Sequence, residues 1–409
     1  MADRRVDVLL VGGGVASATC AEELRSRGFE GSVLLVGREP DPPYERPPCS
    51  KDYLRGETGR EDTYLKPEAW WGEHGVELLT RTSVLKLDPE ARVARLSTKE
   101  EVEYGQALIA TGANVRRLPV DGAQLDGIHY LRALGNADAI RSDAAQAPGD
   151  DVVVVGGSYL GTELAASLTQ LGKRVTCLML EDVPLEKAYG RTAGGWFASV
   201  LEERGVAFAG GDCLAAFVGP EEGRVTAVRT EGGAELPAGL VVVAAGAVPD
   251  TMLAKQSGLE IGPTGGVRCD AALRVVGADG LWAAGDMCEW DSPLHGEPAR
   301  VEHWEVAAAH GRTAAAGIAG APTEHTEVPY FWSDIADWAS SEYVGAMPAD
   351  GWDDEVVRGS LDDGAFSVWF LAQGRVVATL SVGRSGDLDE GRRLIASREV
   401  VDPVALAAG

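Results

Sequence analysis

The sequence predicts an α/β protein with two Rossmann-like domains and a smaller C-terminal α+β domain. Three observations support this fold class. Residues 6–39 run as strand, glycine turn, helix and second strand, with the helix apolar on one face. The same order returns at residues 151–178. From residue 323 the pattern changes to alternating strands and a last short helix.

Composition and charge exclude several classes of function. At 409 residues with 45% hydrophobic content, the chain fits two or three domains with large cores. A net charge of −26 opposes binding to a phosphate backbone, so we expect no nucleic-acid partner. The apolar runs, of which 240–248 is typical, are too short to span a bilayer, and no membrane partner is expected. Six scattered cysteines without metal-ligand spacing predict reduced thiols, a cytoplasmic location and no metal site.

The first glycine turn has the spacing of a dinucleotide site. Gly12 follows the strand 6–11 and allows a tight turn, while Gly14 lets the backbone approach a pyrophosphate. The helix that begins with Val15 and Ala16 offers unpaired N–H groups and a positive dipole end to phosphates. The expected ligand of this turn is a dinucleotide.

Two positions depart from the usual fingerprint of such a turn. Ser17 stands where a third glycine or alanine would give the closest helix packing. Arg38 stands where a carboxylate usually binds a ribose hydroxyl, and Glu39 is the neighbouring residue that can substitute. A single GxG also occurs in ordinary α/β turns, and the repeat at residues 151–178 is what favours the dinucleotide site.

A proline-rich passage follows at residues 40–57. Its prolines exclude helix and central strand until after Pro48 and hold Arg46 and Lys51 in a rigid loop, which we interpret as a cationic loop beside a cofactor. Strand patterns then lead to a strand at 107–110, which ends in Thr111 and Gly112, where the chain is expected to pass close to the ligand.

The second glycine turn repeats the first with its own substitutions. Gly156 begins it and Gly161 keeps the last glycine, while Ser158 replaces the central one. Glu163 lies in the first helical turns. The second strand ends in methionine, and the nearest carboxylate belongs to Glu181.

The later segments supply a third ligand-facing turn and two helices. Residues 240–250 are expected to form a buried strand followed by an Ala-Gly turn. Another strand is expected at 281–284, followed by Gly285 and Asp286. Asp286 fits either a helix N-cap or a hydrogen bond to the ribityl chain of a flavin. An alanine-rich helix is expected from about Glu302, and a last helix at about 391–401.

Five motifs in order resemble the FAD-dependent pyridine nucleotide oxidoreductases of the ferredoxin reductase branch, a family that includes putidaredoxin-reductase-like enzymes and apoptosis-inducing factor. The resemblance covers essentially the whole chain. The motifs are YERPPCSK, GGSYLGTE, WAAGDM, VEHWEVAAAHG and PYFWSD. It implies a glutathione-reductase-like fold with an FAD-binding domain at 1–112 and 247–322. An NAD(P)H-binding domain would span 113–246, and the C-terminal domain 323–409.

The resemblance also implies where the cofactors bind. The residues expected to bind FAD are Gly12, Gly14, Val15, Ala16, Glu39, Arg46, Lys51, Thr111, Gly112, Asp286, Glu302, His303, Trp304 and Trp332. The residues expected to bind the nicotinamide dinucleotide are Gly156, Tyr159, Leu160, Gly161, Glu163 and Glu181. Core packing is the alternative role of both tryptophans.

The resemblance implies that Lys51 and Glu163 form the catalytic pair. In this family the lysine approaches the flavin and pairs with the glutamate, and its positive charge would stabilise the negative charge that develops during hydride transfer. We therefore expect NADH, in preference to NADPH, to reduce FAD. Single electrons would then pass to a small iron–sulfur ferredoxin that feeds a monooxygenase or dioxygenase. The enzyme would be a monomer or homodimer.

Two other functions stay open at this point. Dithiol chemistry is not expected, because no redox cysteine pair follows the first βαβ unit. Cys49 replaces the usual leucine of the RPP motif, so an NADH oxidase or peroxidase that works through this thiol is one alternative, and an apolar filler is the other reading of Cys49. A redox-sensing interaction protein like apoptosis-inducing factor is the remaining alternative.

Overall fold

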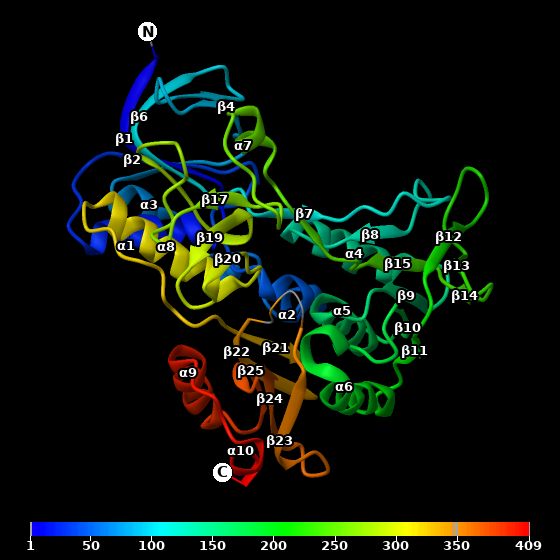
Figure 1. Ribbon diagram of the computed structural model, residues 1–409. Helices are drawn as coiled ribbons and strands as arrows, with labels where there is room; N and C mark the ends of the chain where they lie inside the picture. Colours follow the sequence, from blue (N-terminus) through cyan, green and yellow to red (C-terminus); the bar gives the residue numbers. More distant parts are fainter. Residues whose placement is uncertain (1, 347, 349–350, 409) are drawn as a thin grey trace. The chain divides into compact units, whose positions relative to one another are not determined.

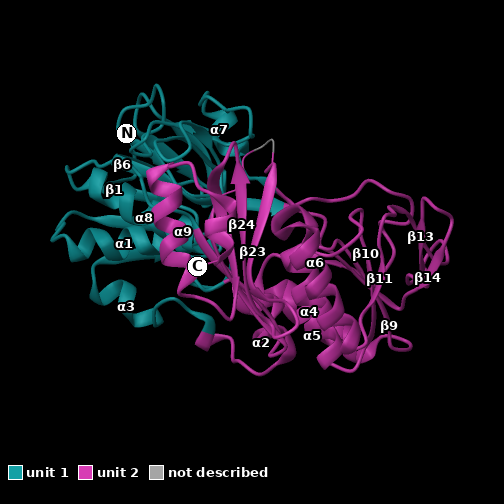
Figure 2. Ribbon diagram, turned by 60° about the horizontal axis from the view of Figure 1, so that its bottom comes forward, with its two compact units in different colours: residues 1–45, 63–114, 248–329 teal, residues 46–62, 115–247, 330–409 magenta. Residues whose placement is uncertain are grey.

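The computed structural model describes residues 2–346, 348 and 351–408 and has the predicted α/β fold class (Figure 1). The chain divides into two compact units, drawn in different colours in Figure 2. Unit 1 comprises Met1–Glu45, Thr63–Asn114 and Val248–Pro329, and unit 2 comprises Arg46–Asp62, Val115–Ala247 and Tyr330–Gly409. The three-domain boundaries given above stay a prediction.

A mixed sheet forms the centre of unit 1. Its strand order is β3-β2-β1-β6-β5-β4, and β18 pairs with β6. The pairs of β1 with β2 and β6, of β2 with β3 and of β6 with β18 are parallel, whereas β4 and β5 are antiparallel to their neighbours. Parallel strands are covered on both faces, which explains the unbroken apolar run of β1. The strands are β1 (Arg4–Val11), β2 (Val33–Val36), β3 (Val76–Leu79), β4 (Val84–Asp88), β5 (Val93–Leu96), β6 (Glu101–Ile109) and β18 (Leu281–Ala283).

Two helices pack side by side on one face of this sheet. Ala16 and Leu24 of α1, together with Ala314 and Ile318 of α8, share a buried core with Val8 and Leu10 of β1. A Cβ atom on Gly311 of α8 would lie 2.4 Å from the carbonyl oxygen of Ala16, so the two helix backbones touch. The other elements of unit 1 are short. The helices are α1 (Val15–Ser26), α3 (Glu68–Glu73), α7 (Met252–Gln256) and α8 (Trp304–Ile318), and a small sheet contains β17 (Val267–Cys269), β19 (Cys288–Ser292) and β20 (Glu297–Ala299).

The second Rossmann-like sheet belongs to unit 2. Its order is β11-β10-β9-β15-β8, and every pair in it is parallel. An antiparallel sheet of β12, β13 and β14 adds Phe217 and Val228 to the same core. The elements are β8 (Ile128–Tyr130), α4 (Leu134–Gln146), β9 (Asp151–Val155), α5 (Tyr159–Gln170), β10 (Arg174–Leu178), α6 (Glu186–Glu203), β11 (Ala207–Ala209), β12 (Leu214–Val218), β13 (Ala227–Thr230), β14 (Glu235–Pro237) and β15 (Leu240–Val243). The strands β7 (Ala113–Val115) and β16 (Ala247–Pro249) lie where the chain passes from one unit to the other.

The C-terminal part of unit 2 is an antiparallel sheet with two helices, as expected for a small α+β domain. The strand order is β21-β22-β25-β24-β23, with Phe366, Trp369 and Phe370 completely buried. Its elements are β21 (Tyr330–Ile335), β22 (Ala339–Gly345), β23 (Asp354–Ser360), β24 (Ala365–Ala372), β25 (Arg375–Val382), α9 (Asp387–Ser397) and α10 (Pro403–Ala408). Unit 2 also contains the short segment η1 (Pro47–Ser50) and α2 (Asp52–Arg55) from the proline-rich passage.

Some predicted boundaries were wrong. The last long helix begins at Asp387 and ends at Ser397, four residues before the predicted 391–401 at each end. Acidic residues in the first turn favour this start, and Arg398 ends the helix in the left-handed region, where glycine is the usual signal. Within 240–250, the predicted buried strand is β15, and the predicted Ala-Gly turn separates it from β16. The predicted strand 107–110 is the end of the longer β6, and α8 begins at Trp304 instead of Glu302.

Candidate active site

The first glycine turn has room for an anion at the start of α1. Gly12 has φ +120°, and a Cβ atom there would lie 2.1 Å from the carbonyl oxygen of Ala110, so glycine is required. A Cβ on Gly14 would meet nothing within 4 Å. No side chain caps α1, and its first turn, which begins with Val15 and Ala16, holds no acidic residue. The amides of this turn therefore fit a pyrophosphate group.

Three other predicted FAD residues lie at the same edge of the sheet. In the parallel register, Val11 pairs with Ile109 and Ile109 pairs with Ala283. The segments that follow these strands carry Gly12, Thr111 with Gly112, and Asp286, which the fold therefore brings to one edge. Ligands of open α/β sheets bind at this carboxyl edge. The Thr111 hydroxyl donates to the Asp250 carbonyl at 2.6 Å, and the Asp250 N–H donates to the Gly112 carbonyl at 2.8 Å.

Glu39 extends this edge by one strand. It follows β2, whose last residue, Val36, pairs with Val11. The Glu39 carboxylate accepts a hydrogen bond from the Tyr44 hydroxyl at 2.5 Å. Arg38 donates to the Asp250 carboxylate at 2.9 Å. Glu39 thus lies at the position expected for the residue that binds a ribose hydroxyl. Arg38 is paired instead with the carboxylate of Asp250.

Two residues that we did not predict hold the Gly285–Asp286 turn. His310 of α8 accepts the N–H of Gly285 at its Nδ1 atom, 3.2 Å away. Burial lowers the pKa of His310 well below its usual range, so the ring is neutral and carries its proton on Nε2. Arg300 donates to the Asp286 carbonyl at 2.9 Å. Asp286 lies inside the short helix Gly285–Met287 with Ala284 as N-cap, and the expectation that Asp286 itself is an N-cap was wrong.

The N-terminus of α8 contains the other predicted residues of unit 1. His303 is the N-cap of α8, and burial lowers the pKa of His303 to about 4. Glu302 forms an ion pair with Arg300, which also holds Asp286. Trp304 is the first residue of the helix. Glu302 is therefore linked through Arg300 to the Asp286 turn.

The second glycine turn is in direct contact with the helix that follows it. Gly156 has φ +122°, and its Cβ would lie 2.4 Å from the carbonyl oxygen of Ala244. A Cβ on Gly161 would lie 1.9 Å from the carbonyl oxygen of Gly156, so α5 begins in contact with the turn. Ser158 is the N-cap but makes no capping hydrogen bond, and the first turn, which includes Tyr159 and Leu160, holds no acidic residue. This turn also fits a pyrophosphate group.

The side chains near the second glycine turn include a buried aromatic pair and a paired carboxylate. Tyr159 packs edge-on against Tyr189, with ring centroids 5.4 Å apart, and burial raises the pKa of Tyr159 well above its usual range. Beyond β10, Met179 is buried, while Leu180 is 62% exposed. Glu181 is 21% exposed and forms an ion pair of 2.7 Å with Lys187. The nearest carboxylate to the end of the second strand is therefore half-buried and paired.

The ion pair implied by the family resemblance is present in unit 2. Lys51 follows η1, and its Nζ atom lies 2.8 Å from Oε1 of Glu163 on α5. The two side chains are 14% and 9% exposed. Ser50 donates to the other carboxylate oxygen at 2.6 Å, and Ser333 donates to Oε1 at 2.7 Å. Sequence reasoning missed both serines, although they stand inside the RPPCSK and PYFWSD motifs.

Three further predicted residues have simpler surroundings. Arg46 donates to the backbone carbonyl of Arg132 at 2.8 Å, within unit 2. Trp332 lies on β21 with its ring stacked near Tyr330, the centroids 6.4 Å apart. Cys49 is only 3% exposed. Such burial suits an apolar filler better than a thiol that must reach a peroxide.

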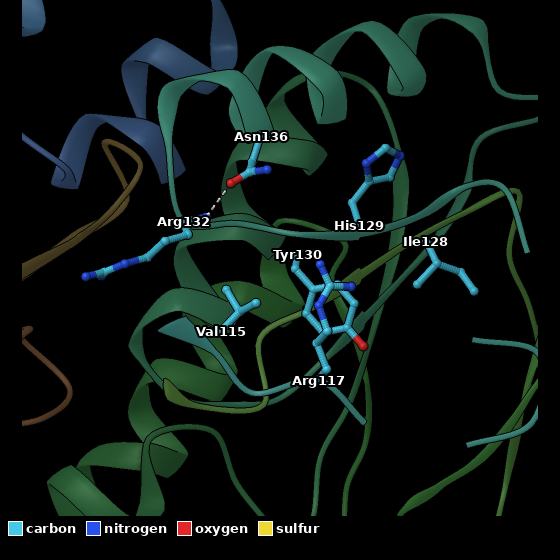
Figure 3. Close-up of a pocket in the computed structure, with 7 residues that line it drawn as sticks. All are labelled: Val115, Arg117, Ile128, His129, Tyr130, Arg132 and Asn136. Carbon is cyan, nitrogen blue, oxygen red and sulfur yellow. Dashed lines mark hydrogen bonds between the residues drawn. The ribbon is translucent and has the colours of Figure 1, made fainter. Parts of the chain in front are cut away.

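A separate cavity of about 250 Å³ lies beside β8 and the start of α4 (Figure 3). The Arg117 guanidinium lies over the Tyr130 ring at 5.0 Å, and Asn136 accepts the N–H of Arg132 at 3.2 Å. The Arg132 side chain points away from the Tyr130 ring in this view. The complete lining is Val115, Arg117, Ile128, His129, Tyr130, Arg132 and Asn136. The backbone carbonyl of Arg132 accepts the hydrogen bond from Arg46, a predicted site residue.

The described residues contain neither a membrane-spanning helix nor a cluster of metal ligands. No helix in the described part of the chain is long and apolar enough to cross a bilayer. No group of three or more histidine, cysteine or acidic side chains among residues 2–346, 348 and 351–408 could hold a metal ion.

Two glycine turns, each following a strand with parallel neighbours, and a buried lysine–glutamate pair define an oxidoreductase with two dinucleotide-binding turns. The chain belongs to the pyridine nucleotide-disulphide oxidoreductase family, whose model matches residues 6–311. A second model, the reductase C-terminal domain, matches residues 330–409.

Relatives of known name match over almost the full length. Rhodocoxin reductase of Rhodococcus erythropolis is 33% identical over 97% of this chain and 91% of its own. The ferredoxin–NAD(+) reductase component of the anthranilate 1,2-dioxygenase system of Burkholderia cepacia is 33% identical, over 98% of this chain and 96% of its own. Among solved structures, the covalent putidaredoxin reductase–putidaredoxin complex matches with TM-score 0.91 and 30% identity, over 100% of this chain and 96% of that chain.

Proposed function

We propose that this protein is an NADH-dependent ferredoxin reductase that passes single electrons to a small iron–sulfur protein of an oxygenase system. The observation that carries the proposal is the buried ion pair of Lys51 and Glu163, 2.8 Å apart. It joins the RPPCSK loop to the helix of the second glycine turn. A cation in a site of low polarity stabilises negative charge that develops next to it.

The relatives support this reaction and the type of partner. One is named as the ferredoxin–NAD(+) reductase component of a dioxygenase system, and one solved relative is a complex with putidaredoxin. Each match includes the C-terminal domain as well as the two glycine turns, because it covers at least 98% of this chain. A shared arrangement over the whole length favours a shared type of electron acceptor.

The chain supplies binding groups and charge in this reaction. The turn at Gly12 and the side chain of Asp286 would hold FAD, and the turn at Gly156 would hold NADH. When bound, FAD supplies the ability to accept two electrons and release them singly. Lys51 would contribute its positive charge, and Glu163 would keep this ammonium group fixed in place.

We propose NADH as the preferred donor because a carboxylate follows the second strand. A carboxylate there favours a free 2′-hydroxyl, whereas a 2′-phosphate requires arginine. Glu181 is paired with Lys187 at 2.7 Å, which leaves one carboxylate oxygen for a ribose. Glu181→Arg is expected to reduce kcat/KM with NADH about tenfold or more and to raise it with NADPH. Steady-state kinetics with both nucleotides would measure this, and a parent enzyme that already prefers NADPH would contradict the proposal.

The main test compares electron acceptors. Steady-state NADH oxidation would be measured with a panel of ferredoxins, with oxygen and with hydrogen peroxide, and ferredoxins are expected to give the highest turnover. Peroxide turnover that disappears in Cys49→Ser would instead support a thiol peroxidase. Negligible turnover with every acceptor would favour a redox-sensing interaction protein.

The role of Lys51 has its own test. In Lys51→Met, the limiting rate of FAD reduction in stopped flow is expected to fall about 100-fold, while the Kd for NADH changes much less. Lys66→Met is a matched control, because Lys66 forms an ion pair with Glu22 at the surface of unit 1. An unchanged limiting rate in Lys51→Met would remove Lys51 from the mechanism.

A further inference from the structure

Glu163 accepts hydrogen bonds from three side chains, and one of them comes from the C-terminal domain. Lys51 Nζ and Ser333 Oγ both contact Oε1, at 2.8 and 2.7 Å, and Ser50 Oγ contacts Oε2 at 2.6 Å. Glu163 is only 7% exposed. A buried carboxylate needs such donors, because burial disfavours its charged form.

Ser333 is a polar residue at a position where the strand pattern calls for an apolar one. On β21 the buried positions alternate as Phe331, Ser333 and Ile335. Ser333 is 4% exposed, and its hydroxyl proton is directed to Glu163. An ionised carboxylate only accepts hydrogen bonds, and this hydroxyl supplies one donor to it.

The backbone around Ser333 is held by a second layer of hydrogen bonds. Ser341, its register partner on β22, donates to the Ser333 carbonyl at 3.2 Å. The Tyr189 hydroxyl of α6 lies 2.8 Å from the Ser341 hydroxyl. Both groups are buried. The Ser333 backbone therefore cannot shift without breaking contacts of β22 and α6.

The other side of the carboxylate is held by the RPPCSK loop and by α5 itself. Ser167, one helical turn after Glu163, donates to the Ser50 carbonyl at 2.7 Å. Ser50 is thus fixed through both its carbonyl and its hydroxyl. Ser50 thus donates to Oε2 of Glu163, and Lys51 and Ser333 donate to Oε1.

We propose that Ser333 is a positioning residue for hydride transfer, which keeps the Glu163 carboxylate aimed at Lys51. The C-terminal domain then contributes directly to the position of the Lys51 charge through this hydroxyl. Loss of the donor would let the carboxylate turn, so that Glu163 would hold the Lys51 ammonium group less firmly. The proposal rests on the proposed roles of Lys51 and Glu163.

The test is Ser333→Ala, studied by stopped-flow reduction of the FAD-loaded enzyme with saturating NADH at neutral pH. The limiting rate is expected to fall about tenfold, since a hydrogen bond to a charged group is lost. The Kd for NADH should change less than twofold. Ser333→Thr, which keeps a hydroxyl, should restore most of the rate.

A matched control and an independent readout separate this role from a structural one. Ser340→Ala removes a hydroxyl from the neighbouring strand that donates to Asp334 at 2.7 Å, and should leave the rate unchanged. The midpoint potential of bound FAD, measured against a reference dye, should fall in Ser333→Ala, because the cation near the cofactor is held less firmly.

Each outcome decides one proposal. A normal rate in Ser333→Ala, together with a slow Lys51→Met, would overturn the role of Ser333 alone. An unchanged Lys51→Met would overturn the role of the ion pair and the role of Ser333 with it. A rate loss in Ser333→Ala with an unchanged midpoint potential would also overturn the positioning role.

Discussion

The two glycine turns share one constraint and differ in another. In both, the first glycine has a left-handed φ and faces a carbonyl oxygen of a neighbouring strand, Ala110 for Gly12 and Ala244 for Gly156. Five residues later they diverge. Gly161 would place a Cβ 1.9 Å from the carbonyl oxygen of Gly156, whereas Ser17 of α1 is accommodated and completely buried.

The difference shows where each helix makes its closest approach. In the second turn α5 approaches its own glycine loop, so glycine is needed at position 161. In the first turn α1 makes its closest backbone contact with α8, where Gly311 approaches Ala16. The same strand–turn–helix pattern thus uses its glycines for different contacts, which depend on the helix that packs next to it.

The largest expected effect separates the ligands of the two turns. Gly12→Ala and Gly156→Ala each force a side chain into a left-handed conformation and into a carbonyl oxygen. Gly12→Ala is expected to be purified with little or no FAD. Gly156→Ala should keep its FAD but bind NADH more weakly, with a Kd raised at least about 10-fold. The ratio of flavin to protein absorbance and an NADH titration would measure both, and loss of FAD from both variants would contradict separate ligands.

A smaller effect is expected from making the second turn resemble the first. Gly161→Ser should destabilise the protein by about 3 kcal/mol or more, because a backbone atom must move to admit the side chain. Gly195→Ser on α6 is the control, since a Cβ there meets nothing within 4 Å. Urea unfolding of both variants is the measurement. A Gly161→Ser variant as stable as the control would mean that α5 and its turn have more room than the structure shows.

The smallest effect concerns the buried hydroxyl of the first turn. Among the described residues, the Ser17 hydroxyl has no hydrogen-bond partner. Ser17→Ala is therefore expected to stabilise the protein by about 1 kcal/mol, through removal of an unsatisfied group and the better helix propensity of alanine. Ser199→Ala is the control at an exposed position of α6, where the hydroxyl is satisfied because it donates to the Gly195 carbonyl at 3.1 Å. Equal gains in the two variants would show that the Ser17 hydroxyl costs nothing.

Local signals in the sequence predicted much of the fold. The turns at Gly12 and Gly156 were evident because glycine is required there by backbone conformation. The boundary of α9 was missed because Arg398, and no glycine, ends this helix in the left-handed region.

The site was predicted less completely than the fold. The pair of Lys51 and Glu163 followed from a family resemblance and not from spacing, since the two residues are far apart in the chain. Ser333, His310 and Arg300 were missed because their partners are separated from them in sequence and are brought near only by the packing of strands and helices.

The discontinuity of unit 1 has a consequence for folding during synthesis. Its sheet needs β18, and its α1 needs α8, so neither contact can form until the chain has been made beyond residue 318. The sheet of β8, β9, β10, β11 and β15 lies wholly within residues 128–243 and is complete earlier. On a ribosome, where folding generally starts from the N-terminal end, the second Rossmann-like sheet can therefore be finished before the first. Until then the apolar face of β1 would remain exposed, and the nascent chain would be most prone to aggregation during this period.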